Sequence, residues 1–202
     1  MKAEQALQKL IEGNKRFVEA TSGDGEVVSD ISCVDQETQK PFAVILGCAD
    51  SRVPPEFVFN CGVGDLFVVR VAGNTVAPSQ LGSIEIGCEY FGAELIVVLG
   101  HTGCGAVKVT IDSLLEDAPR DSNNIAAIVD SVSPAVQELV NKKAHNDRDH
   151  LFEIAIHANI KQSVHGLSEH SEILRNLVAD SKLKIVGAEY SIKTGVVQFL
   201  DE

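Results

Sequence analysis

Two cysteines and a histidine stand in two short segments whose composition suits a metal ion. The segments are residues 48–52 (CADSR) and residues 101–105 (HTGCG). Thiolate and imidazole groups are ligands that zinc prefers, and three protein ligands with one open position are typical of a catalytic zinc site. The residue types therefore predict a catalytic zinc held by Cys48, His101 and Cys104.

Either cysteine, taken alone, would more often be a small buried apolar residue than a ligand. The two become candidates together because each segment follows an apolar run, residues 42–46 and residues 95–99. Short runs rich in Val, Ile and Leu that stop at a glycine indicate buried parallel strands. Sites in open α/β sheets lie at the carboxyl ends of such strands. We therefore expect two neighbouring strand ends to bring the three donors together.

Asp50 and Arg52 follow Cys48 and form the second layer of the predicted site. Two positions apart in an extended segment, their side chains point to the same side. Asp50 either binds the metal as a conditional fourth ligand or pairs with Arg52 and leaves that position to water. Only the second arrangement has a nucleophile, so the two arrangements differ in activity. The plain alternative is a strand-end ion pair, which is worth little at a surface.

Around these segments, strand-like and helix-like apolar patterns alternate along the chain. This alternation predicts one α/β domain over residues 1–202, with a mainly parallel central sheet flanked by helices and an N-terminal helical arm over about residues 1–35. The expected strands are residues 42–46, 66–71, 95–99, 183–190 and an antiparallel edge strand at 196–200. The expected helices are residues 3–20, a short helix opened by Pro54, and 79–91, 105–115, 125–140, 151–167 and 171–178.

The charge and cysteine content restrict the partners and the location of the protein. The chain has 202 residues and a formal net charge of −12, which repels a nucleic-acid backbone and an anionic membrane surface. We therefore expect no nucleic-acid and no membrane partner. Five cysteines, an odd number without a signal peptide, favour a reducing cytoplasm. Cys33, Cys61 and Cys88 are predicted not to be ligands, with Cys88 in the core of the protein.

The two segments, Cys-x-Asp-x-Arg after one strand and Gly-His-Thr-x-Cys-Gly after another, resemble the β-class carbonic anhydrases. The resemblance covers essentially the whole chain and includes residues 12–17 (EGNKRF), 39–41 (QKP) and 65–74 (DLFVVRVAGN). It implies an enzyme that uses Zn²⁺ for the reversible hydration of carbon dioxide to bicarbonate and a proton.

The resemblance also implies roles for individual residues. Cys48, His101 and Cys104 would bind the zinc, and Asp50 and Arg52 would form a dyad that gates and orients a water molecule on it. The substrate pocket for carbon dioxide and bicarbonate would be lined by Gln39, Phe67, Val53 and Gly103.

The family also assembles, so the expected partner is a second copy of the chain. Gln39 and Phe67 would reach the pocket across a dimer interface, and the N-terminal helix would pack on a neighbouring subunit. We therefore expect a homodimer or a homotetramer.

Three residues depart from the pattern of the family. Ile86 stands where a Tyr is frequent, so a hydroxyl group near the pocket is lost. Ile45 replaces the Trp of members with a regulatory bicarbonate pocket, so that regulation is not expected. Ala49 replaces a frequent Ser, with little expected effect. Two alternatives stay open: hydrolysis of another small electrophile, such as carbonyl sulfide or carbon disulfide, and a catalytically weak zinc-binding homologue.

Overall fold

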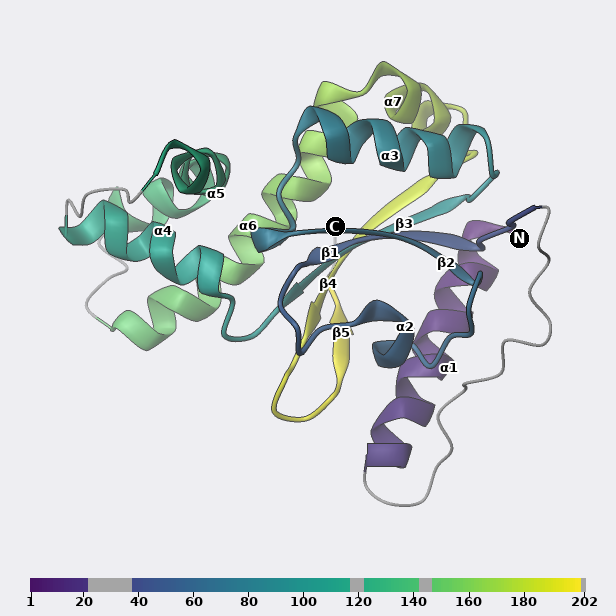
Figure 1. Cartoon of the computed structure of the whole chain (residues 1–202), viewed down its shortest axis with the longest axis horizontal. Helices are drawn as coiled ribbons and strands as arrows, with labels where there is room; N and C mark the ends of the chain where they lie inside the picture. The colour runs from purple at the N-terminus through teal and green to yellow at the C-terminus, as the bar shows by residue number, and fades with distance from the viewer. Residues whose placement is uncertain (22–37, 117–121, 142–146, 201–202) are drawn as a thin grey trace.

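A five-stranded sheet organises the described part of the chain. The computed structural model describes residues 1–21, 38–116, 122–141 and 147–200. The strands are β1 (Ala43–Cys48), β2 (Leu66–Val71), β3 (Leu95–His101), β4 (Lys184–Tyr190) and β5 (Val197–Phe199). Their order is β2-β1-β3-β4-β5, and only β5 is antiparallel to its neighbour (Figure 1). The predicted mainly parallel sheet with an antiparallel edge strand is confirmed.

Helices cover both faces of this sheet. On one face lie α1 (Ala3–Thr21) and the short α2 (Pro55–Val58), and on the other lie α3 (Pro78–Glu89), α6 (Arg148–His170) and α7 (Glu172–Ala179) (Figure 1). A single 3₁₀ turn, η1 (Ala72–Asn74), follows β2. The helices α4 (Gly105–Glu116) and α5 (Asn123–Asn141) pack beside α6 beyond the carboxyl ends of the strands. No helix among the described residues is long and apolar enough to cross a membrane.

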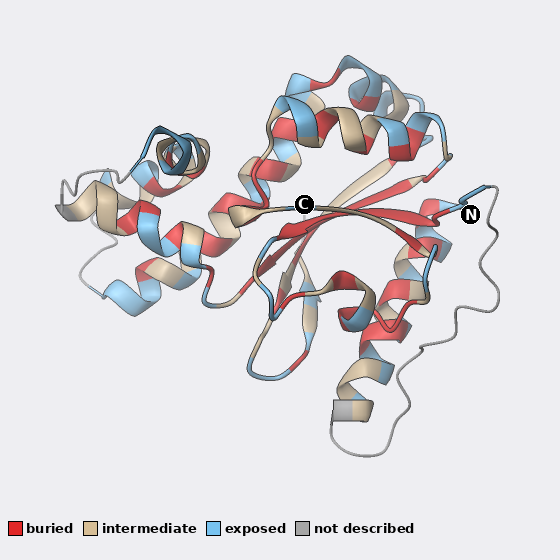
Figure 2. Ribbon diagram, in the orientation of Figure 1, coloured by how far each residue is buried: buried red, intermediate tan, exposed pale blue. Residues whose placement is uncertain are grey.

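The two central strands are buried along their whole length (Figure 2). β1 is hydrogen-bonded on both sides, to β2 and β3, and β3 is hydrogen-bonded to β1 and β4. Because helices close both faces as well, every position of these strands faces protein. This environment explains the continuous runs of Val, Ile and Leu in their sequences.

Both central strands extend further than their apolar runs suggested. β1 continues to Cys48 and β3 to His101, so these two ligand candidates belong to the strands themselves. The sequence analysis took Gly47 and Gly100 as stop signals, but both lie inside the sheet. At Gly100 an added Cβ would lie 2.5 Å from the Ile160 side chain. The glycine therefore allows α6 to approach the sheet closely and does not mark a turn.

The N-terminal helix packs on the sheet of its own chain, and the expected contact with a neighbouring subunit stays a prediction. Ala6 and Leu10 are completely buried against the face of the sheet that α1 covers. The buried Asn14 side chain donates to the carbonyl oxygens of Val58 and Gly195, at 2.9 and 2.8 Å. These contacts tie α1 to α2 and to the β4–β5 hairpin. The rest of the predicted arm, after residue 21, lies outside the described residues.

Candidate metal centre

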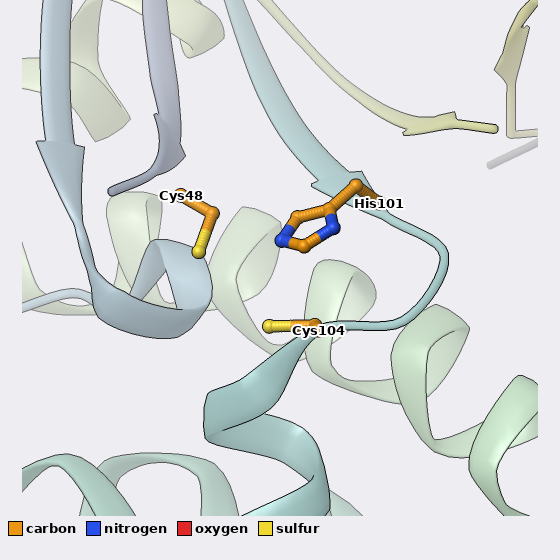
Figure 3. A group of neighbouring side chains, drawn as sticks. All are labelled: Cys48, His101 and Cys104. Carbon is orange, nitrogen blue, oxygen red and sulfur yellow. The ribbon is translucent and has the colours of Figure 1, made fainter. Parts of the chain in front are cut away.

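Three buried donor atoms meet at the carboxyl edge of the sheet. Cys48 ends β1, His101 ends the neighbouring strand β3, and Cys104 stands one residue before α4. Their side chains point toward one another (Figure 3), and one ligand atom from each lies within 4.8 Å of the other two. The structure therefore brings together the three residues that the sequence suggested, because two adjacent parallel strands end side by side.

The hydrogen bonds around His101 leave one ring nitrogen available. Its Nδ1 lies 3.0 Å from the carbonyl oxygen of Thr102, and since a carbonyl only accepts, Nδ1 carries the proton. The Nε2 atom then has a lone pair, is buried and has no hydrogen-bond partner among the described residues. A buried polar atom without a partner is costly. A cation bound by Nε2 and the two sulfur atoms removes that cost, so the donor set fits a zinc ion.

The two thiols influence each other's ionisation. A hydrogen bond from Cys104 is the main reason that the pKa of Cys48 is lowered to about 4, and the backbone N–H of Gly73, at 3.4 Å, also donates to its sulfur. The pKa of Cys104 is raised, first because it donates its proton to Cys48 and second because it is buried. One thiolate therefore forms easily, and the second proton leaves when a cation binds.

Two cysteines of the described residues lie outside this cluster and serve as internal references. Burial raises the pKa of Cys61 and of Cys88 to about 12. Both thiols lie in the apolar core, as predicted for Cys88, whereas Cys33 falls outside the described residues.

These pKa values lead to a prediction about thiol reactivity. In metal-free protein at pH 7, we expect iodoacetamide to alkylate Cys48 at least ~100-fold faster than Cys61 or Cys88, because only the thiolate form reacts. Site-resolved mass spectrometry measures the three rates, and zinc added beforehand should protect Cys48. Equal rates at the three cysteines would contradict the lowered pKa of Cys48.

Asp50 and Arg52 form a close ion pair beside the donor cluster. The Asp50 carboxylate accepts from Arg52 Nε at 2.9 Å, from Arg52 Nη2 at 2.7 Å and from the Arg52 backbone N–H at 3.0 Å. The segment is a turn and not the extended chain that was expected, because the carboxylate also accepts a backbone N–H two residues ahead. Its Oδ2 atom is 4.0 Å from His101 Nε2. Of the two arrangements considered, the structure shows Asp50 paired with Arg52.

The arginine keeps Asp50 ionised. Hydrogen bonds from the Arg52 side chain are the main reason that the pKa of Asp50 lies far below its usual range, and burial opposes this only in part. The carboxylate is therefore a hydrogen-bond acceptor at every pH at which the protein would be assayed.

Arg70 is a site residue that the sequence analysis did not assign. It lies on the edge strand β2, and its Nε donates to the carbonyl oxygen of Cys48 at 2.8 Å. Its Nη2 donates to the carbonyl oxygen of Asp50. One guanidinium thus holds the backbone that carries a candidate ligand and the acid of the dyad. The sequence feature that could have drawn attention to Arg70 is its position as a single charged residue inside the apolar run LFVVRV.

Of the four residues expected to line the pocket, two contact the dyad through their backbones. The carbonyl oxygen of Gly103 lies 3.5 Å from Arg52 Nη2, and the N–H of Val53 donates to the carbonyl oxygen of Asp50 at 3.0 Å. Val53 is completely buried in the core on the α1 side. Gln39 precedes β1 and Cys48 is the last residue of that strand, so the five residue steps of the strand, about 17 Å, separate the two. Phe67 lies four register positions, about 13 Å, from the residue paired with Cys48. Gln39 and Phe67 therefore do not reach the donor cluster of their own chain.

None of the three departures from the family pattern belongs to the donor cluster, and Ala49 is exposed beside Cys48. Ile86 is 44% exposed on α3, and Ile45 is completely buried in β1.

Comparisons with known proteins agree with this geometry. Residues 43–197 match the family model described as carbonic anhydrase. Carbonic anhydrase 2 of Mycobacterium tuberculosis is 36% identical over 190 residues, which cover 94% of this chain and 89% of the relative. The chain belongs to the β-class carbonic anhydrases.

Solved structures of this class show the same fold as this carbonic anhydrase. The β-carbonic anhydrase CcaA superimposes with a TM-score of 0.72 at 27% identity, covering 96% of this chain and 95% of that one. A structure described as a tetrameric β-carbonic anhydrase from Sordaria macrospora has a TM-score of 0.71 at 21% identity, covering 82% and 83% of the two chains. The family's fold therefore supports the arrangement of strands that places Cys48 beside His101.

Proposed function

We propose that this carbonic anhydrase catalyses the reversible hydration of carbon dioxide to bicarbonate and a proton, with a zinc ion held by Cys48, His101 and Cys104. The observation that carries the proposal is the buried Nε2 atom of His101, which has no hydrogen-bond partner in the described part of the chain. This atom faces two cysteine sulfurs and lies 4.0 Å from the Asp50 carboxylate, which is paired with Arg52. Membership of the carbonic anhydrase family supports the choice of reaction.

The residues of the chain would divide the work as follows. Zinc bound at this site would lower the pKa of a coordinated water molecule toward neutrality. The Asp50 carboxylate would accept a hydrogen bond from the attacking water and so fix the direction of its lone pair. Arg52 would hold both carboxylate oxygens in place and keep Asp50 from becoming a fourth ligand.

A second copy of the chain would complete the substrate pocket. Gln39, which precedes β1, and Phe67, near the start of β2, lie too far from the donor cluster of their own chain, so a partner subunit would have to supply them. This requirement supports a homodimer, and the solved relative that is described as tetrameric agrees with a larger assembly. The cytoplasmic location and the absence of nucleic-acid and membrane partners stay predictions from composition.

Stopped-flow measurement of carbon dioxide hydration by the zinc-loaded protein tests the proposal. We expect kcat/KM above about 10⁴ M⁻¹ s⁻¹, the lower end of the usual range for enzymes. A zinc-loaded protein that shows no hydration at neutral or alkaline pH would refute the reaction. Turnover of carbonyl sulfide or carbon disulfide by that same sample would establish the alternative hydrolase, and no turnover of any of the three would establish the weak homologue.

A further inference from the structure

A buried asparagine on α6, Asn159, is hydrogen-bonded to the 3₁₀ turn η1, which lies next to the donor cluster. Asn159 is only 2% exposed, and its Nδ2 donates to the carbonyl oxygen of Gly73 at 2.9 Å. A buried side-chain amide without a hydrogen-bond partner would destabilise the fold, so this bond contributes to the stability of α6 on the sheet. It joins residues that are 86 positions apart in the sequence.

The depth at which α6 packs on the sheet fixes the position of Asn159. The next residue, Ile160, is completely buried, and its side chain packs against Gly100 of β3 and Gly187 of β4. An added Cβ would lie 2.5 Å from the Ile160 side chain at Gly100 and 2.8 Å from it at Gly187. Because both strands lack a side chain there, α6 is held close to the sheet, and Asn159 is held at the level of Gly73.

Gly73 connects this helix to the candidate metal ligand. It adopts φ 70° and ψ 20°, which few other residues tolerate, and an added Cβ would lie 2.9 Å from that of Ala106. Its carbonyl oxygen accepts from Asn159, and its N–H donates to Cys48 Sγ at 3.4 Å. The two bonds hold the peptide units on both sides of Gly73 in place.

We propose that Asn159 is a positioning residue for Cys48 and acts through the backbone of Gly73. The Asn159 bond holds Gly73 so that its N–H meets the sulfur, which turns Sγ toward His101 and Cys104. An N–H donor to a thiolate also withdraws negative charge from the sulfur, so Cys48 donates less charge to a bound cation. The inference rests on the proposed zinc site. It adds that a residue of α6, outside the two segments that carry the ligands, helps to position one of them.

Asn159→Leu removes the donor while keeping a side chain of similar size. We expect its zinc affinity, measured by chelator competition on the full chain, to fall about 10–100-fold, as is usual when a partner of a metal ligand is lost. We also expect the thiolate-to-cobalt charge-transfer band of the cobalt-loaded protein to shift. Ser163→Ala is the matched control, because Ser163 is also buried on α6, one turn further on. It should keep the zinc affinity and the band of the wild-type protein.

The outcomes separate this inference from the zinc site itself. A wild-type protein without a thiolate-to-cobalt band would refute the zinc site. A wild-type band that is unchanged in Asn159→Leu, with zinc affinity within twofold, would refute only the role of Asn159. If the Asn159→Leu protein does not fold, the Asn159→Ala protein is measured in its place. In the wild-type protein loaded with ¹¹³Cd, a scalar coupling between the metal and the Gly73 amide proton is expected, and its absence would also refute the inference.

Discussion

Cys48→Ser is expected to reduce the zinc content of the purified protein from about one ion per chain to almost none and to reduce carbon dioxide hydration to the rate in buffer alone. The serine hydroxyl is not ionised at neutral pH and is a poor zinc ligand, whereas Cys48 ionises easily because Cys104 and Gly73 donate to its sulfur. Metal analysis of the dialysed protein and stopped-flow hydration measure the two losses.

Cys88→Ser is the matched control for this change. Cys88 is equally buried, in the core on the same side of the sheet, but it is not part of the donor cluster. This variant should keep its zinc and its activity, with at most a loss of thermal stability. Zinc retained by Cys48→Ser, or lost from Cys88→Ser, would show that the ligands are assigned wrongly.

Asp50→Asn is expected to slow carbon dioxide hydration by about 10²- to 10⁴-fold while the zinc content stays that of the wild-type protein. The asparagine has the same shape but loses the charge that pairs with Arg52 and one of the two acceptor oxygens that would orient the attacking water, and losses of about this size follow when a positioned group that handles the reacting proton is removed. Stopped-flow rates and metal analysis on the same preparation give the two values.

The control for Asp50→Asn is Asp65→Asn. Asp65 also pairs with a basic residue, Lys9, and also accepts a backbone N–H, that of Gly62, but it precedes β2 at the far edge of the sheet. Hydration by this variant should stay within twofold of the wild-type rate. A zinc-loaded Asp50→Asn protein that is as active as the wild type would remove Asp50 from the mechanism.

The pH dependence of the Asp50 variant follows from the sign of the pKa shift. The pKa of Asp50 is lowered in the folded protein, chiefly by the hydrogen bonds from Arg52. The pair therefore stabilises the fold above the usual carboxyl pKa, and this contribution is lost only as the pH falls through the lowered value. Across the neutral and alkaline range Asp50 stays ionised, so the activity ratio of wild type to Asp50→Asn should not change with ionisation of this carboxyl.

Local patterns in the sequence were enough to predict the elements around the site. The runs before Cys48 and before His101 were recognised as buried strands because continuous Val, Ile and Leu occur where a strand has protein on both faces. The ends of those strands were harder to place. Gly47 and Gly100 were taken as stops because a glycine that ends a strand and one inside a strand have the same sequence signature. At Gly100 the structural reason is the close approach of Ile160 on α6.

The sequence by itself determined the family and predicted the three donor residues and the Asp50–Arg52 pair, because these lie in two contiguous segments whose residue types are read directly. Only the tertiary structure decided that Asp50 pairs with Arg52 in a turn and that α1 packs on its own sheet. It also decided that Arg70 binds the backbone of Cys48 and that Asn159 binds the backbone of Gly73. Local patterns report burial and periodicity. Hydrogen bonds between distant segments depend on which surfaces the folded chain brings together, and no local pattern contains that information.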